Sequence, residues 1–132
     1  METTTFAALL AGVGIAIGAT WSGLLANFAA GIFLVLLRPF KVGDFVTAGG
    51  VTGTIDSIGL FGTSMNTPDN VRTIVGNNKI LSDNIHNFSM NAFRRVDLVA
   101  QIAHDVNYRE ATNLLKTGLT TIPHVLVSPR RT

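Results

Sequence analysis

The sequence predicts a membrane-spanning α-helix, an all-β domain after it, and the start of an α/β domain at the C-terminal end. The helix is predicted by the absence of charged side chains between Thr3 and Leu37. Short β-branched runs separated by turn residues predict the β-domain. An alternating run followed by a helical pattern predicts the last part. We expect the divisions to fall at residues 1–37, 38–93 and 94–132.

The uncharged segment is longer than a signal peptide or a simple membrane span. Its apolar part runs from Phe6 to Leu37, whereas the apolar stretch of a signal peptide reaches at most about 15 residues. A continuous helix of this length would measure about 48 Å, and the hydrocarbon core of a bilayer is only about 30 Å thick. We therefore expect the helix to tilt or to bend, and Gly23 and Gly31 are the expected kinks because helix kinks concentrate at such residues.

Basic residues follow the apolar segment directly. Arg38 and Lys41 come immediately after it, and no Lys or Arg precedes it. Because loops rich in Lys and Arg stay on the cytoplasmic side, we expect the C-terminal portion to be cytoplasmic.

Small residues form two stripes along the predicted helix when successive residues are placed 100° apart. The first stripe contains Gly12, Ala16, Ala19, Gly23, Ala26 and Ala30, and the second contains Ala7, Ala11, Gly14, Gly18, Ser22 and Ala29. Small residues let helices approach closely in a membrane. Two stripes that do not face opposite directions indicate two neighbours, and such head-to-tail contacts close into a ring. The expected packing residues are Gly12, Gly14, Ala16, Gly18, Ala26 and Ala30.

Ile15 lies in the sector between the two stripes, with Ala19 near its edge. This sector would face the axis of a ring. A ring of bulky apolar side chains among small ones can close a pore by excluding water. The alternative is a helix packed tightly in an ordinary membrane bundle, which explains the small residues but not their division into two stripes.

The region after the helix reads as a series of short strands. Pro39 ends the helix, because proline disfavours helical geometry in the residue before it. The expected strands are 42–46, 51–58, 60–65, 71–75 and 85–88, with one helical turn over 79–84, and this spacing indicates a small β-barrel or β-sandwich. Beyond Arg95 we expect a strand over 96–106, a helix over 108–117 with Asn107 as its N-cap, and a strand fragment at 125–127. These last elements are too few to bury a core, so we expect an incomplete α/β domain.

Composition excludes several classes of function. The formal net charge is only +2, and the two tight basic pairs, at 94–95 and 130–131, do not form the clustered face that nucleic acid requires. Cysteine is absent and the His residues at 86, 104 and 124 are scattered, so we expect neither a metal site nor a cofactor. No paired carboxylates, nucleophile–base pair or phosphate loop stands out, so we do not expect an enzyme.

Several motifs in order resemble the small-conductance mechanosensitive channel family. They are the runs GIAIG (14–18), NFAAG (27–31), LRPFKVGD (37–44), VTGTI (51–55) and NNKILSDNIHNF (77–88). The resemblance covers about residues 7 to 110.

The resemblance implies a homoheptamer in the inner membrane, in contact with lipids. The pore helix would bend at Gly23 and Gly31, and residues 38–93 would form an Sm-like β-domain. Membrane tension during hypo-osmotic shock would open a pore for ions and small solutes. Two bulky apolar rings close the family's pore at the positions of Ile15 and Ala19, and Ala19 departs from this pattern. The family carries two tension-sensing helices before the pore helix, so we expect this chain to be a fragment, a truncated reading frame or one portion of a longer channel.

The alternative function is a membrane-anchored Sm-like β-domain that acts as a binding or scaffold module. Binding of RNA by such a domain is not favoured, because the β-region lacks basic residues interleaved with aromatic ones. Replacing Gly14 and Gly18 with leucine distinguishes the two functions. An anchor should tolerate both changes, whereas a ring of helices should not.

Overall fold

The computed structural model of the protein describes residues 2–126. The chain divides into two compact units, the first ending at Arg94 and the second beginning at Arg95. The elements of the first unit are α1 (Glu2–Leu37), β1 (Phe45–Ala48), β2 (Val51–Ile58), β3 (Gly62–Asn66), β4 (Arg72–Gly76), α2 (Asn77–Ser82) and β5 (His86–Asn87). The second unit contains α3 (Tyr108–Thr120).

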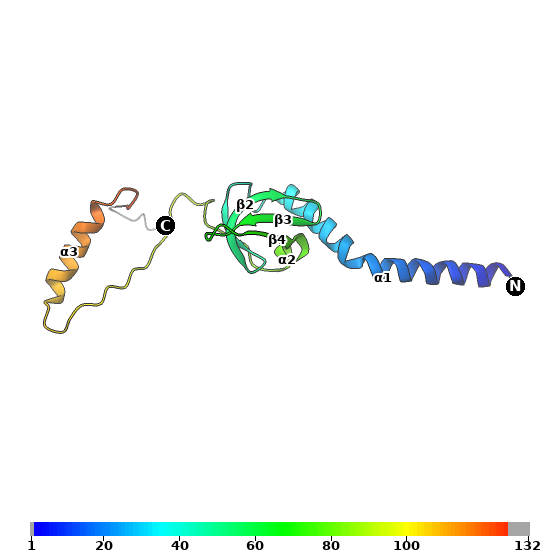
Figure 1. The fold of residues 1–132 in the computed structure, drawn as a ribbon, viewed down its shortest axis with the longest axis horizontal. Coiled ribbons are helices and arrows are strands. Elements are labelled where there is room, and N and C mark those ends of the chain that lie inside the picture. The colour runs from blue at the N-terminus through cyan, green and yellow to red at the C-terminus, as the bar shows by residue number, and fades with distance from the viewer. Residues whose placement is uncertain (1, 127–132) are drawn as a thin grey trace. The chain divides into compact units, whose positions relative to one another are not determined.

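The predicted membrane helix is present as α1, a single helix of 36 residues. It ends at Leu37, where Arg38 takes a positive φ of 47° and its N–H donates to the Leu34 carbonyl at 3.1 Å. The predicted end of the helix at Pro39 is thus confirmed. α1 continues through Gly23 and Gly31, and its axis changes direction along its length (Figure 1). Bends at those two glycines stay predictions.

The β-domain is one antiparallel sheet of five strands in the order β4-β3-β2-β1-β5. Gly49 and Gly50, with φ of 58° and 80°, connect β1 to β2 in a two-residue turn that needs positive φ at both positions. The partner register of β2 and β3 shifts between Ile55 and Ser57. Asp56 is therefore the extra residue of a β-bulge.

Two strands, β1 and β3, begin at least two residues later than the sequence predicts. The strand predicted over 42–46 begins at Phe45, because residues 41–44 close a turn in which the Asp44 N–H donates to the Lys41 carbonyl at 3.1 Å. The strand predicted over 60–65 begins at Gly62, because a bond of 2.9 Å from the Gly59 N–H to the Gly62 carbonyl holds the β2–β3 turn. Residues 79–82 of the predicted helical turn over 79–84 belong to α2, which ends at Ser82, whereas residues 83 and 84 lie outside the helix.

The hydrophobic core lies between the sheet, α2 and the C-terminal part of α1. Its buried residues are Leu34, Phe40, Val46, Ala48, Ile55, Met65, Val75 and Ile80. Leu34 of α1 is fully buried, and Figure 1 shows the cyan end of α1 beside the sheet. The end of the long helix is therefore part of the β-domain fold rather than a separate tether.

The second unit confirms one prediction and contradicts another. α3 begins as predicted, and the Asn107 side chain caps it by accepting from the Arg109 N–H at 3.1 Å. The strand predicted over 96–106 is wrong, because these residues form no strand. A strand needs a partner for its backbone groups, and among the described residues of this unit no second strand is present. The fragment predicted at 125–127 forms no strand at 125–126, and Val127 lies outside the described residues.

Candidate functional site

The N-terminal two thirds of α1 expose large apolar side chains. Ile15 is 74% exposed and Trp21 is 58% exposed. No residue of α1 before Ala30 is buried. Among residues 2–126, α1 is the only helix long and apolar enough to cross a membrane. A large apolar side chain left in water forgoes about 1.5–3 kcal/mol relative to burial. This part of α1 therefore requires lipid or other helices around it.

The glycines of α1 fall into two groups. A Cβ atom added at Gly12, Gly14, Gly18 or Gly23 would meet nothing within 4 Å in the described part of the chain outside the helix's own nearby backbone. A Cβ at Gly31 would lie 2.5 Å from the Leu60 carbonyl oxygen and 2.6 Å from Nδ2 of Asn77. Gly31 therefore lets the β-domain approach the helix, while the other four glycines leave open surface.

The predicted site residues divide in the same way, into exposed positions early in α1 and more covered positions toward its C-terminal end. The pore residues Ile15 and Ala19 and the packing residues Gly12, Gly14, Ala16 and Gly18 are exposed, whereas Ala26 is half-buried. Ala30 is only 3% exposed, so this chain's own fold already covers it. The orientation of Ile15 toward a pore axis and the packing roles, that of Ala30 included, stay predictions.

Asn27 joins the middle of α1 to the β-domain. Its Oδ1 atom accepts from the Asn78 N–H at 2.9 Å, and its Nδ2 donates to the Gly23 carbonyl at 3.0 Å. The N-cap of α2 is Gly76, which has no side chain to serve as a cap. A Cβ at Gly76 would lie 2.9 Å from Oδ1 of Asn27. Asn27 thus supplies from α1 the acceptor that an N-cap side chain supplies in other helices.

Replacing Asn27 with alanine is expected to destabilise α2 by about 1 kcal/mol, the usual cost of losing an N-cap. Amide exchange at Asn78 should become faster, because its N–H loses its acceptor. The matched control is the exposed Asn113 of α3, whose replacement by alanine should leave exchange in α2 unchanged. Unchanged protection of Asn78 in the Asn27 variant would contradict the capping role.

Asn77, the first residue of α2, is fully buried beside the same junction. Its Oδ1 accepts from the Thr63 hydroxyl at 2.8 Å, and its Nδ2 donates to the carbonyls of Gly59 at 2.8 Å and Leu60 at 3.1 Å. Burial of an amide is unfavourable unless it is hydrogen-bonded. These bonds satisfy it and fix the β2–β3 turn against α1.

Asp44 organises the turn through which the chain leaves α1. Its Oδ2 accepts from the Lys41 N–H at 2.9 Å and from Nδ2 of Asn87 at 2.8 Å. The hydrogen bond from the Lys41 backbone, followed by that from the Asn87 side chain, lowers the pKa of the Asp44 carboxyl. Both donors favour the charged carboxylate, so the turn is best held when Asp44 is ionised.

The lowered pKa of Asp44 predicts the direction of a pH effect. A carboxyl whose pKa is lower in the folded chain stabilises the fold above its ordinary pKa of about 3.9, and this stabilisation is lost as the pH falls through the lowered value. An NMR titration of the Asp44 carboxyl carbon should therefore show a midpoint below the ordinary one. In an Asn87→Ala variant the midpoint should rise. The same midpoint in both chains would contradict the contribution of Asn87.

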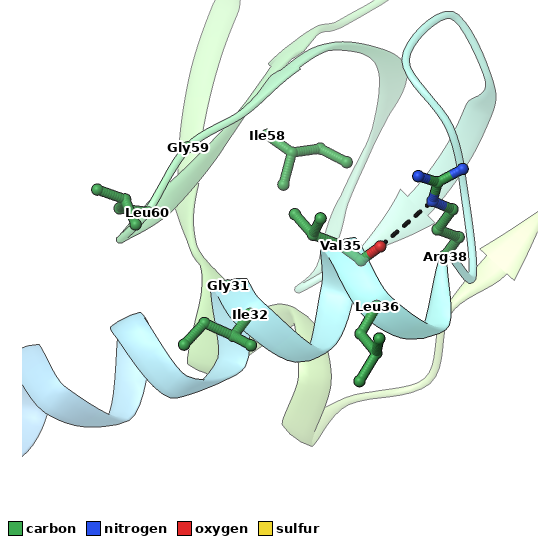
Figure 2. A pocket seen from close by; sticks show the side chains of 8 residues that line it. All are labelled: Gly31, Ile32, Val35, Leu36, Arg38, Ile58, Gly59 and Leu60. Carbon is green, nitrogen blue, oxygen red and sulfur yellow. Dashed lines mark hydrogen bonds between the residues drawn. The ribbon is translucent and has the colours of Figure 1, made fainter.

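A cavity of about 830 Å³ opens between the end of α1 and the β2–β3 turn (Figure 2). Its lining residues are Gly31, Ile32, Val35, Leu36, Arg38, Ile58, Gly59 and Leu60. Arg38 is the one charged residue among them, and its Nε donates to the Val35 carbonyl at 3.3 Å. The cavity is an apolar recess with a single basic group, placed where α1 ends.

Sequence reasoning missed Asn27 and Asn77 as functional residues. The signal for Asn27 was present, because an asparagine in an uncharged apolar segment requires a hydrogen-bonding partner. Asn77 carried no comparable signal, since asparagine is common in turns.

The fold and the contacts between α1 and the β-domain define a class of protein. It is a membrane protein whose apolar helix is built into a five-stranded β-domain. The family model described as "Mechanosensitive ion channel, beta-domain" matches residues 23–90. The match includes the end of α1 as well as the sheet. The chain therefore belongs to the mechanosensitive ion channel family.

Individual relatives agree with this family. The small-conductance mechanosensitive channel of Edwardsiella ictaluri is 46% identical over 94 residues, covering 71% of this chain and 33% of that protein. An uncharacterized MscS family protein of Buchnera aphidicola subsp. Schizaphis graminum is 40% identical over 116 residues, covering 88% and 41%. The crystal structure of Helicobacter pylori MscS in its closed state matches with a TM-score of 0.84 and 28% identity, covering 93% of this chain and 49% of that one.

These matches confirm the predicted fold class, a membrane helix followed by the family's β-domain. This chain spans from a third to about half of the length of these three proteins. The assignment of residues 94–132 to an incomplete α/β domain stays a prediction.

Proposed function

We propose that this chain forms part of the pore of a mechanosensitive ion channel, which passes ions and small solutes when membrane tension or hypo-osmotic shock opens it. The observation that carries the proposal is the division of α1 into two parts. Its C-terminal part is buried in the family's β-domain through Leu34, while Ile15 stays 74% exposed among free small residues. Exposure of this kind in an apolar helix suits a surface that meets neighbouring copies and a pore.

The pore is proposed to be a ring of identical copies, a heptamer as in the family. The open surface at Gly12, Gly14 and Gly18 supports the ring, because small residues would let neighbouring helices approach closely and packing drives association in membranes. Membrane lipids would cover the opposite face, which carries Ile17 and Trp21. The basic residues after α1 support a cytoplasmic position for the β-domain, with α1 in the inner membrane.

The β-domain offers further surface for the same assembly. β4 and β5 are the two edge strands of the sheet, and Ile74 of β4 is 73% exposed. An edge strand with exposed apolar side chains is a template for pairing with another chain. Contact between β-domains of neighbouring copies would cover such an edge and would add to the contacts of α1.

Substitution of the free glycines tests the proposal. The chain carrying Gly14→Leu and Gly18→Leu should lose its oligomeric mass in detergent by light scattering, and its tension-activated current in patches of reconstituted vesicles. The matched control is Val13→Leu, on the face of α1 opposite to Ile15. This variant should change neither the oligomeric mass nor the current. A double variant that assembles and conducts like the unaltered chain would exclude the ring and leave the chain as a membrane anchor for its β-domain.

A further inference from the structure

One side chain connects the place where the chain leaves α1 to the place where it leaves the β-domain. We call residues 38–44 the exit turn and residues 86–90 the departure segment. Nδ2 of Asn87 donates to the Pro39 carbonyl at 3.2 Å and to Oδ2 of Asp44 at 2.8 Å. Its Oδ1 accepts from the N–H groups of Ser89 at 2.9 Å and Met90 at 3.0 Å. Asn87 therefore bonds the exit turn with one end of its amide and the departure segment with the other.

This arrangement uses the full hydrogen-bonding capacity of an asparagine side chain, which has two donors and two acceptor positions. An inverted amide would turn its oxygen toward the carboxylate of Asp44 and its donors toward two backbone N–H groups. Aspartate would keep the acceptors but lose the donors, and serine has one donor only. The chemistry of the site thus requires an amide at this position.

Few backbone hydrogen bonds hold the departure segment against the sheet. β5 has only two residues paired with β1, Val46 opposite Asn87 and Thr47 opposite His86. A single further backbone bond follows, from Phe88 N–H to the Phe45 carbonyl at 3.0 Å. A ladder this short frays readily, so side-chain bonds determine whether the segment stays in place.

A second side chain reinforces the same connection. The Ser89 hydroxyl accepts from the Phe45 N–H at 2.9 Å, immediately after Asp44. The ring centroids of Phe45 and Phe88 lie 5.8 Å apart, and the Arg94 guanidinium lies 4.4 Å from the centroid of the Phe88 ring. The contacts run from the exit turn to the last residue of the first unit.

We infer that Asn87 is a positioning residue that couples the exit turn to the departure segment, so that a displacement of the end of α1 reaches the chain leading to residues 95–126. The inference rests on the proposed function, because it matters for gating only if α1 lines a pore. In structural terms, it states that the hydrogen bonds of the exit turn and those of the departure segment break and form together. A side chain that merely fills space would leave each segment independent of the other.

Amide exchange of the full chain in detergent tests the coupling without any channel activity. In Asn87→Ala, exchange at Ser89 and Met90 should become faster because their acceptor is lost. The decisive amide is Lys41, which donates to Asp44 and not to Asn87. Coupling predicts about threefold to tenfold faster exchange there, the range that loss of one hydrogen bond gives.

The reverse experiment must agree, because coupling between two sites is reciprocal. In Asp44→Ala, exchange at Ser89 and Met90 should also become faster, although both donate to Asn87. The matched control is the exposed Asn84→Ala, whose side chain makes none of these bonds and which should change none of these amides. The coupling would be overturned if amide exchange at Lys41 were unchanged in the Asn87 variant and exchange at Ser89 and Met90 were unchanged in the Asp44 variant.

If the alanine variants fold poorly, exchanging the amide of Asn87 and the carboxylate of Asp44 between the two positions keeps the test decisive. Asn87→Asp retains the acceptors for the departure segment but places a carboxylate against Asp44, so Lys41 should exchange faster. Adding Asp44→Asn restores a donor facing residue 87, and exchange at Lys41 should return toward that of the unaltered chain. A double variant that exchanges as fast as Asn87→Asp alone would contradict a direct contact between the two side chains.

Patch-clamp recording then separates the coupling from the proposed function. If the unaltered chain conducts, Asn87→Asp should change the tension needed for opening and the double variant should restore it. If the unaltered chain, Asn87→Asp and the double variant opened at equal tension, the transmission of a displacement between the departure segment and the pore helix would be overturned. If the unaltered chain passes no current, the proposed function fails, and the exchange rates still decide whether the two segments are coupled.

Discussion

Replacing Ile15 with serine in the full-length context is expected to make the pore conduct without applied tension. In the proposed ring each copy contributes one Ile15 side chain to the constriction, and an apolar constriction closes by excluding water. Ile15 is 74% exposed in the single chain, so it is free to line such a surface. Loss of an isoleucine side chain removes about 1.5–3 kcal/mol of apolar transfer free energy. Even one such contribution corresponds to more than about a tenfold change in the closed–open equilibrium.

The effect should be stronger here than in a channel with two apolar rings, because Ala19 provides no second bulky side chain at the neighbouring position. The measurement is the current through patches of reconstituted vesicles at zero applied pressure. Ile17→Ser is the matched control, since Ile17 is also exposed, at 53%, but lies on the opposite face of α1. A closed-state current that is the same in the Ile15 and Ile17 variants would remove Ile15 as the seal.

Replacing Gly31 with alanine is expected to destabilise the chain by about 1–3 kcal/mol, as overpacking does in a close-packed core. The added Cβ would lie 2.5 Å from the Leu60 carbonyl oxygen and 2.6 Å from Nδ2 of Asn77. Neither group moves aside easily, because one is backbone and the other is fully buried and hydrogen-bonded. The clash should therefore outweigh the gain of about 1 kcal/mol that alanine gives over glycine in a helix.

Gly23→Ala in the same helix should act in the opposite direction. A Cβ there meets nothing within 4 Å in residues 2–126 outside the nearby helix backbone, so only the gain in helix propensity remains. Denaturant unfolding of both variants in detergent compares the two free energies of unfolding. Equal stability of the two variants would show that Gly31 is not required for close approach of the β-domain.

The elements that follow from local patterns were predictable. The uncharged run and Pro39 fixed α1 and its end, and the N-cap Asn107 fixed the start of α3. The predicted start of β1 was wrong, because residues 41–44 prefer a turn closed by Asp44. The strand predicted over 96–106 was wrong, because alternation makes a strand only where a partner strand is present.

The amino-acid sequence by itself determined that an apolar helix with two stripes of small residues precedes a β-domain, since charge, periodicity and turn residues act locally. Only the tertiary structure decided how the two are joined. Gly76 lies opposite Asn27, and Asn27 caps a helix 51 positions further along the chain. Gly31, expected from the sequence as a bend, is the place where the β2–β3 turn approaches α1. Such contacts depend on distances between segments remote in sequence, and no local pattern records them.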